Sequence, residues 1–419
     1  MVPALVEARR AKATTARAFV RVAAAIWLIQ AWAQPSLAQS TTTVASDLAF
    51  PVGLAFLPNG DLVFSEKQGT VRIIEDGVLR AQPLAVIPTV SASETGLLDV
   101  AVPHDVQGDP AVYAFATEPN GLTNTVWRVP LDGSGPMRII EDLPAGTYHN
   151  GGGLAFGADG DLYVTNGEQH ETDRAQDPEA LGGKVYRYEA DGSVPADNPF
   201  GEVPTYALGL RNPFGIAIDP LSGDIWVTEN GPSGDDEVNR IVAQGNYGWP
   251  EVVGSGCDEE CIDPVLSYGS TIVPTGIAFP ASDAPRRLED VFFFAAYGEA
   301  TVHQVTLNDA RTEAVADDIL LRSKEPVIGL EWGPGGLYLS TPSSIKKIAF
   351  RKNSSDQPES RIDPRPSLSP PIGDDEAERE AAGRPWGLLI LGILIGGLIA
   401  MRVRLNEQTR KDLAGDDPS

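Results

Sequence analysis

Short apolar stretches recur along residues 51–348 and are separated by polar turns, many of them Asp-Gly or Asn-Gly. A phrase close to Gly-Leu-Ala-Phe opens each unit, and an alternating apolar segment and a further short segment follow it. Alternation with a period of two is typical of strands, and turns of the Asn-Gly type suit tight hairpins because they tolerate positive φ. The pattern therefore predicts antiparallel sheets joined by short turns.

The unit recurs six times, which indicates a repeat architecture. The six units lie at 51–74, 96–129, 153–187, 215–241, 276–305 and 328–348. Four short strands in each unit, repeated around an axis, predict an all-β fold, a six-bladed β-propeller over residues 39–351. A pair of β-sandwiches is the alternative, but it does not account for the same phrase six times. In a propeller, functional residues are expected in the polar loops at one mouth of the central channel.

The N-terminal segment has the order of a secretory signal peptide over residues 1–38. Basic residues precede a short apolar stretch at 22–33, and Ala38 offers a small residue for cleavage. We expect cleavage near Ala38; an uncleaved N-terminal anchor is the alternative.

The C-terminal segment predicts a transmembrane helix. Residues 386–401 carry no charge, and Arg402 and Arg404 follow at once, so a span over 386–405 approaches the ~20 residues that a bilayer requires. Basic residues mark the cytoplasmic side, so the tail at 406–419 is expected in the cytoplasm and the propeller on the periplasmic or extracytoplasmic face. Residues 352–385, rich in Pro, Ser, Asp and Glu, are expected to form a disordered stalk.

Charge and cysteine content narrow the function. The chain has 58 acidic and 32 basic side chains and a formal net charge of -26, which argues against nucleic acid as a partner. The acidic residues offer oxygen ligands for a hard cation such as Ca²⁺. Cys257 and Cys261 are the two cysteines, and outside the cytoplasm a disulfide is their expected state. A zinc site is disfavoured because no histidine lies near them in sequence.

Several longer motifs are more specific than the repeat. They lie at 96–104, 149–160, 175–200, 206–215 and 229–250. Through them, residues 45–350 resemble the soluble sugar dehydrogenases that use pyrroloquinoline quinone (PQQ), the glucose/sorbosone and aldose sugar dehydrogenase family. The resemblance implies a propeller that oxidises an aldose or related alcohol by hydride transfer to PQQ, with Ca²⁺ as a further cofactor.

The resemblance assigns roles to five residues near the predicted mouth. His149 matches the family's general base, a role that suits a neutral imidazole. Glu168 stands where the family has an Asp that orients this base, and Glu is one methylene longer. Arg211 and Asn212 match a pair that contacts the quinone oxygens, and Glu94 stands where the family has Gln. A turn-bridging histidine and a structural ion pair are the alternative readings of His149 and Arg211.

The resemblance also implies metal ligands. Gly231 and Pro232 match backbone carbonyls that hold the cofactor's calcium ion. The segment Asp235, Asp236 and Glu237, with Tyr247 close by, matches one that helps to bind a second, structural calcium ion. Three successive acidic residues also suit a solvated turn, which is the alternative.

Two departures keep a second class of function open. The family's arginine pair at the start of the last inner strand has no counterpart in residues 324–332, and its lysine in the fifth unit is not evident in 295–303. PQQ carries three carboxylates, so fewer basic partners weaken its binding. The chain is therefore expected to be a membrane-anchored sugar dehydrogenase beside a membrane electron acceptor, or a propeller ectodomain that lost the cofactor site and binds a ligand or partner. A calcium-dependent lactonase is a third reading with less support.

Overall fold

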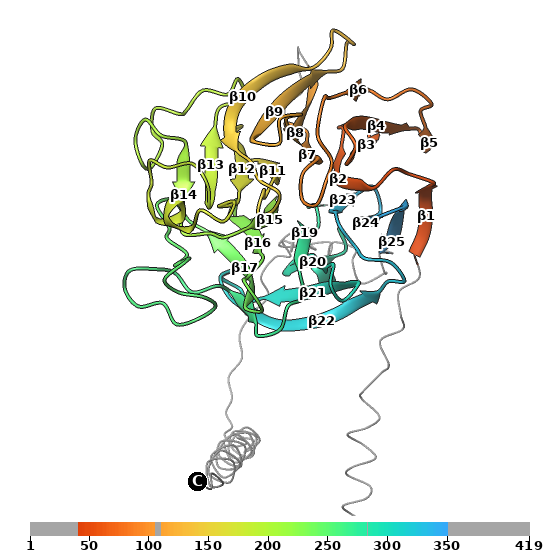
Figure 1. Cartoon of the computed structure of the whole chain (residues 1–419). Helices are drawn as coiled ribbons and strands as arrows, with labels where there is room; N and C mark the ends of the chain where they lie inside the picture. Colours follow the sequence, from red (N-terminus) through yellow and green to blue (C-terminus); the bar gives the residue numbers. More distant parts are fainter. Residues whose placement is uncertain (1–40, 105–109, 283, 351–419) are drawn as a thin grey trace, which may run out of the picture. The chain divides into compact units, whose positions relative to one another are not determined.

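A computed structural model describes residues 41–104, 110–282 and 284–350, which fold into six antiparallel sheets arranged around a central channel (Figure 1). The first sheet contains β2 (Pro51–Phe56), β3 (Leu62–Glu66), β4 (Thr70–Glu75), β5 (Val78–Leu79) and β6 (Ala85–Val86). The second contains β7 (Leu97–Ala101), β8 (Ala111–Thr117), β9 (Thr123–Pro130) and β10 (Met137–Pro144). The third contains β11 (Leu154–Phe156), β12 (Leu162–Asn166), β13 (Lys184–Tyr188) and β14 (Thr205–Ala207).

The remaining sheets follow the same order. The fourth contains β15 (Pro213–Ile218), β16 (Ile225–Glu229), β17 (Asp236–Ile241) and β18 (Leu266–Tyr268). The fifth contains β19 (Pro274–Ala278), β20 (Val291–Ala296), β21 (Thr301–Leu307) and β22 (Ala314–Arg322). The sixth contains β23 (Leu330–Gly333), β24 (Gly336–Thr341) and β25 (Ser344–Ala349) together with β1 (Thr41–Ser46). The predicted six-bladed β-propeller is confirmed, and the inner strands β2, β7, β11, β15, β19 and β23 follow one another around the channel.

β1 closes the ring. It pairs antiparallel with β25, with Thr41 opposite Ile348 and Ser46 opposite Ser344, so the first described strand of the chain completes the last blade. The sequence of this segment does not predict a strand, because Thr-Thr-Thr-Val-Ala-Ser lacks a clear apolar face and no repeat unit begins there. Closure by a strand from the other end of the propeller couples the first and sixth blades and covers the edge of β25.

The glycine of the repeated phrase is required by the packing of neighbouring inner strands. A Cβ on Gly215 would stand 2.2 Å from the carbonyl oxygen of Thr275 in the next blade, and one on Gly329 would stand 2.1 Å from that of Val52. Gly53, Gly153 and Gly276 meet the following blade in the same way. Any larger residue would push the blades apart at the channel, so the repeat in the sequence reflects this close approach.

A hydroxyl group on the second strand links neighbouring blades. Thr228 Oγ1 accepts a hydrogen bond from Gly215 N (2.8 Å) and donates one to Thr275 O in the fifth blade (2.6 Å). Ser340 Oγ in the sixth blade donates in the same way to Val52 O (2.9 Å). These bonds satisfy buried backbone groups that would otherwise lack partners.

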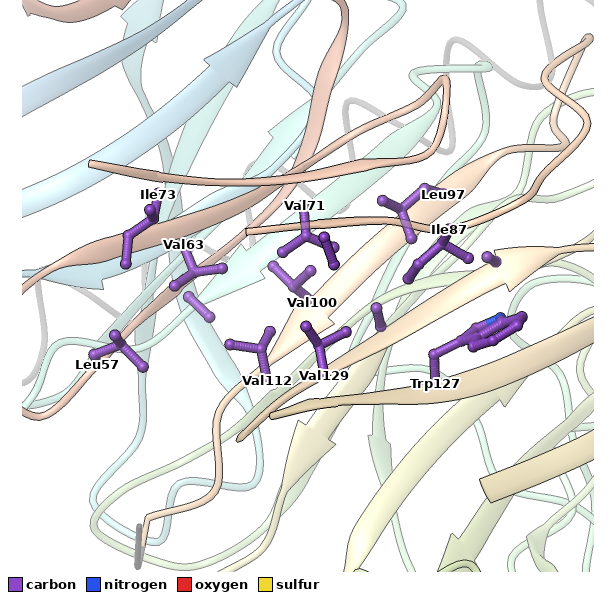
Figure 2. Close-up of a cluster of buried hydrophobic side chains, with 14 residues drawn as sticks. Leu57, Val63, Val71, Ile73, Ile87, Leu97, Val100, Val112, Trp127 and Val129 are labelled. Atoms are coloured by element: carbon purple, nitrogen blue, oxygen red, sulfur yellow. The ribbon is translucent and has the colours of Figure 1, made fainter. Parts of the chain in front are cut away.

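The apolar core lies between the blades. Figure 2 shows the cluster between the first and second blades, where Val63 and Val71 face Val112 and Val129. Trp127 closes the same cluster toward β10 and is stacked by the guanidinium of Arg138, 4.4 Å from the ring centroid. Each inter-blade cluster buries side chains from two sheets, and this burial is the main force that holds the sheets together.

The predicted signal peptide (1–38), stalk (352–385), transmembrane helix (386–405) and cytoplasmic tail (406–419) lie outside the described residues. Within the described part of the chain, no helix is long and apolar enough to cross a membrane. The propeller range predicted from sequence is 39–351, and the described strands run from Thr41 to Ala349. Cys257 and Cys261 form a disulfide in the connection between β17 and β18.

Candidate functional site

One mouth of the channel collects the candidate residues. Because neighbouring strands in a blade are antiparallel, the loop before an inner strand and the loop after the second strand lie at the same end of the sheet. His149 precedes β11 and Arg211 precedes β15, whereas Glu168 follows β12 and Gly231 follows β16. The fold therefore brings loops of the third and fourth blades to the same rim, on the left of the channel in Figure 1.

His149 and Glu168 form a buried pair. Nδ1 of His149 lies 2.5 Å from Oε1 of Glu168, and both side chains are almost fully excluded from solvent. Glu168 Oε2 is buried and has no hydrogen-bond partner in the described structure. A carboxylate oxygen accepts a hydrogen bond from Nδ1–H, and in that tautomer the lone pair of the imidazole lies on Nε2. The longer Glu thus reaches the histidine that the sequence assigned as the base.

Glu94 and Asn212 hold the turn that carries His149. Glu94 Oε2 accepts hydrogen bonds from His149 N (2.7 Å) and from Asn212 Nδ2 (3.2 Å). Asn212 Oδ1 accepts a hydrogen bond from Gly151 N (3.1 Å). The positive φ of His149 (58°) gives this turn a conformation that side-chain residues seldom adopt, and the network stabilises it. The amide nitrogen and the amide oxygen of Asn212 are thus both hydrogen-bonded to other residues of the protein. This favours a role in positioning the turn that carries His149.

Arg211 contacts both the loop that carries Glu168 and the loop at 230–235, which links β16 to β17. Its backbone carbonyl accepts a hydrogen bond from Glu168 N (2.9 Å). Its Nη1 donates to the carbonyl oxygens of Asn230 (2.8 Å) and Gly231 (3.0 Å), and its guanidinium carbon lies 5.4 Å from the ring centroid of Trp249. Arg211 makes no side-chain salt bridge in the described structure, so the structural ion pair considered from sequence is not formed.

A small cavity adjoins Arg211 in the fourth blade. It has a volume of about 20 Å³ and is lined by Gly209, Arg211, Glu229, Gly231, Pro232, Asp235, Glu237, Tyr247, Trp249, Val252 and Val253. Burial raises the pKa of Glu229 well above its usual range, and burial with the nearby Asp235 and Asp236 raises the pKa of Glu237 to about 7. Such clustered carboxylates disfavour one another's ionisation unless a cation joins them. Carboxylate and carbonyl oxygens around a space of this size fit a calcium ion.

Several of the residues assigned to calcium from sequence have protein partners. Asp236 accepts hydrogen bonds from the backbone amides of Gly231 (2.8 Å), Ile272 (2.7 Å) and Val273 (2.8 Å). The hydroxyl of Tyr247 accepts from Val242 N and donates to Arg240 O. Both side chains therefore brace the loop. Glu237 also accepts hydrogen bonds, from Asn239 Nδ2 (2.9 Å) and Gly254 N (3.0 Å). Its oxygens still line the cavity with Gly231, Pro232 and Asp235, so these four residues fit the metal, with the Glu237 oxygens and the Gly231 carbonyl shared with protein donors.

The mouth also supplies cations for an anionic cofactor such as PQQ. Lys67 follows β3, at the same end of the channel, and donates from Nζ to the carbonyl of Ser93, next to Glu94. Burial lowers the pKa of Lys67, and Glu94 opposes this effect. Lys324 precedes the inner strand of the sixth blade and is exposed. With Arg211, these three cations fit three carboxylates in number, although they do not reproduce the family's arginine pair.

The channel beneath the mouth holds two further carboxylates. A cavity of about 320 Å³ is lined by the inner strands, including Asp99 of β7 and Glu331 of β23. Burial raises the pKa of Asp99 to about 7, and burial with the nearby Asp99 raises that of Glu331 to about 8. Asp99 accepts hydrogen bonds from Val100 N (2.8 Å) and Leu154 N (2.9 Å), which joins the second blade to the third.

The sequence did not indicate several of these residues. Lys67 and His170 lie in loops outside the motifs, whereas Glu229 and Trp249 lie within the motif at 229–250 but received no role from it. The repeat places Lys67 near this mouth in retrospect, because Lys67 directly follows the second strand of its blade and Glu168 follows that of the third blade one residue later. His170 stands two residues after Glu168, and its ring centroid lies 4.1 Å from that of His149.

Comparisons with known proteins agree with the fold and the motifs. The family profile described as glucose/sorbosone dehydrogenase matches residues 48–348. An aldose sugar dehydrogenase of Escherichia coli is 29% identical over 357 residues, covering 76% of this chain and 93% of that protein. Quinoprotein glucose dehydrogenase B of Acinetobacter calcoaceticus is 29% identical over 250 residues, covering 50% of this chain and 52% of that protein.

Solved structures give the same result. The PQQ-bound aldose sugar dehydrogenase of Streptomyces coelicolor superposes with a TM-score of 0.66 at 30% identity. The match covers 76% of this chain and 99% of that one. The described propeller therefore corresponds to nearly the whole of a solved relative.

Proposed function

Because the chain belongs to the glucose/sorbosone dehydrogenase family, we propose that the mouth of its propeller oxidises an aldose or a related alcohol with PQQ and Ca²⁺ as cofactors. The observation that carries the proposal is the buried pair in which His149 Nδ1 lies 2.5 Å from Glu168 Oε1. A histidine held in this way has one free nitrogen, Nε2, with which to accept a proton.

The chain's own residues supply the acid–base part of the reaction. The substrate hydroxyl loses its proton to Nε2 of His149, while the carbon-bound hydrogen leaves with its electron pair, so that an aldose becomes a lactone. Glu168 stabilises the imidazolium that forms and keeps the ring in place. When bound, PQQ supplies the electrophilic carbonyl that accepts the hydride.

Arg211 and the cavity beside it, lined by Asp235 and Glu237, are the parts of the site that would bind the cofactor and the metal. The two carbonyls that bind Nη1 fix the guanidinium before any ligand arrives, so its positive charge is available to anionic oxygens with little reorganisation. Gly231, Pro232, Asp235 and Glu237 would hold Ca²⁺, which neutralises the carboxylate cluster and polarises a neighbouring oxygen.

We further propose that the protein is exported and held at the extracytoplasmic face of a membrane by residues 386–405. The charge pattern of the two ends supports this proposal. A membrane tether would keep the site that oxidises the sugar close to a membrane electron acceptor. Fractionation of cells that express the full chain, or a chain ending at residue 351, tests it: the first is expected with membranes and the second in the soluble extracytoplasmic fraction.

Calorimetric titration of PQQ into the purified propeller with Ca²⁺ tests the cofactor proposal. A dissociation constant near or below micromolar is expected, and Arg211→Ala should weaken it at least tenfold. Arg138→Ala is the matched control, because Arg138 pairs with Glu118 on the outer part of a blade. Absence of binding by protein whose circular dichroism shows a folded β structure would overturn the proposal and favour the ligand-binding ectodomain.

A further inference from the structure

Two histidines and a glutamate meet at the rim of the channel. One ligand atom from each of His149, Glu168 and His170 lies within 4.8 Å of the others. The rings of His149 and His170 are tilted by 49° with their centroids 4.1 Å apart. We propose that these three side chains form a binding site for a transition-metal ion, with Zn²⁺ as the best-fitting ion.

The buried glutamate is the strongest sign of a ligand. Glu168 is 1% exposed, and its Oε2 is buried without a hydrogen-bond partner in the described structure. A buried carboxylate oxygen that lacks a partner costs free energy. A cation bound beside it would remove that cost, whereas the bond from His149 satisfies only Oε1.

His170 is free to complete the site. Its side chain is exposed, and it makes no side-chain hydrogen bond among the described residues, its contacts being with the rings of His149 and Tyr148. Ligand atoms around a tetrahedral zinc ion lie about 3.3 Å apart, given metal–ligand distances of about 2.0–2.1 Å. Zinc would replace the proton between His149 Nδ1 and Glu168 Oε1, so these two atoms would move apart from their present 2.5 Å as the exposed His170 side chain rotates inward.

The donor set selects the metal. Two imidazoles and one carboxylate suit zinc, cobalt, nickel or copper, whereas calcium and magnesium prefer oxygen ligands alone. Three protein ligands leave a fourth position for water or a substrate oxygen. This site therefore differs from the all-oxygen cavity around Asp235 and Glu237 in the fourth blade.

The other histidines of the chain do not offer such a site. The chain has four histidines, all within the described ranges. His104 Nε2 lies 3.1 Å from Phe156 O, and the buried His303 places Nδ1 2.8 Å from Asp317 Oδ1. Metal binding that depends on histidine is therefore expected from His149 and His170.

Metal binding has a consequence that rests on the proposed function. A metal held by His149 withdraws the imidazole from proton transfer, so Zn²⁺ should inhibit sugar oxidation. Zn²⁺ inhibits here without occupying the cavity lined by Asp235 and Glu237, so added Ca²⁺ should not relieve the inhibition.

Cobalt substitution tests the site without PQQ or sugar. Full-length protein without an affinity tag is saturated with Ca²⁺ and titrated with Co²⁺, whose four-coordinate complexes absorb strongly in the visible range. One ion per chain is expected, displaced by Zn²⁺, and His170→Ala should weaken binding at least tenfold. His104→Ala is the matched control and should bind as the unchanged protein does. Absence of the absorption, or equal binding by the His170 variant, would overturn the proposal.

Inhibition is measured separately. If the protein oxidises sugar, the Zn²⁺ concentration for half-inhibition should rise at least tenfold in His170→Ala, with each variant compared with its own rate without zinc. If Zn²⁺ inhibits both proteins at the same concentration, the proposal that zinc inhibits oxidation by binding at this site is wrong. Because cobalt binding requires neither cofactor nor turnover, an inactive protein that binds cobalt would contradict the proposed oxidation and leave the metal site standing.

Discussion

The Nδ1 atom of His149 lies 2.5 Å from Oε1 of Glu168, and the two side chains come from separate loops of the third blade. Neighbouring bonds hold the pair: Glu94 accepts from the amide of His149, and Gln169 Nε2 donates to its carbonyl (2.9 Å). A base fixed on both sides of its backbone loses little entropy when it meets a substrate.

Replacement of Glu168 tests this pairing. Glu168→Gln preserves size but removes the charge that stabilises an imidazolium, so kcat should fall about 10- to 100-fold with little change in KM. Glu168→Asp restores the charge at a shorter reach and should recover part of kcat. Steady-state kinetics measure both, and an unchanged kcat in the Gln variant would contradict the positioning role.

The close approach of Gly329 to Val52 across the seam between the first and sixth blades gives a prediction on stability. A Cβ at Gly329 would stand 2.1 Å from Val52 O, so Gly329→Ala should cost about 3 kcal/mol or more of unfolding free energy. Gly269→Ala is the control, because nothing lies within 4 Å of its added Cβ. Urea unfolding of both variants measures the difference, which should be near zero for the control.

Ring closure by β1 gives a second prediction on stability. A chain that lacks residues 1–46 exposes the edge of β25 and loses the ladder from Thr41 to Ser46. It should melt at a lower temperature than a chain that lacks only residues 1–40, and it should self-associate through the exposed edge. Thermal melts and size-exclusion chromatography compare the two, and equal behaviour would show that β1 does not contribute to closure.

Glu331 in the channel predicts how stability changes with pH. Its pKa in the folded protein, about 8, lies above the usual value of 4.5. The neutral form is therefore favoured by folding, so this stabilisation is complete below about pH 4.5 and is lost as the pH rises through 8. Glu331→Gln should stabilise the protein by on the order of 1–2 kcal/mol at pH 9 and by little at pH 5.

Denaturation of the Glu331 variant and the unchanged protein at both pH values checks this prediction. The difference between the two proteins isolates Glu331 from other titrating groups. A difference that does not grow with pH would mean that channel water already solvates the carboxylate.

Calcium removal gives a final prediction. Ca²⁺ at 100 times its dissociation constant should stabilise the folded protein by about 2.7 kcal/mol, and a chelator should remove this effect. Asp235→Asn removes a charge from the cavity and should reduce the calcium-dependent shift in melting temperature. Asp263→Asn is a control, because Asp263 binds the amides of Gly256 and Cys257 and does not line the cavity.

Much of the fold and of the candidate site followed from local sequence. Alternating apolar residues and Asp-Gly turns have their effect within a few residues, so six repeats and their hairpins were predictable. The motifs around His149, Arg211 and Gly231 were equally local, and they indicated the correct family. The strand β1 escaped prediction because its partner, β25, lies at the far end of the propeller sequence and its own residues lack an apolar face.

The amino-acid sequence by itself determined the repeated strands of the six units, the family and the identities of most reactive side chains. Tertiary structure decided which of those side chains are free to react. Asp236 and Tyr247 match metal-binding positions in sequence, yet backbone groups occupy their polar atoms: amides of the loop before β19 bind Asp236, and Val242 N binds the Tyr247 hydroxyl. His170 has no motif, yet the fold places it against His149. Hydrogen-bond partners and neighbours of this kind depend on how distant loops meet when the blades pack, and no local pattern encodes that meeting.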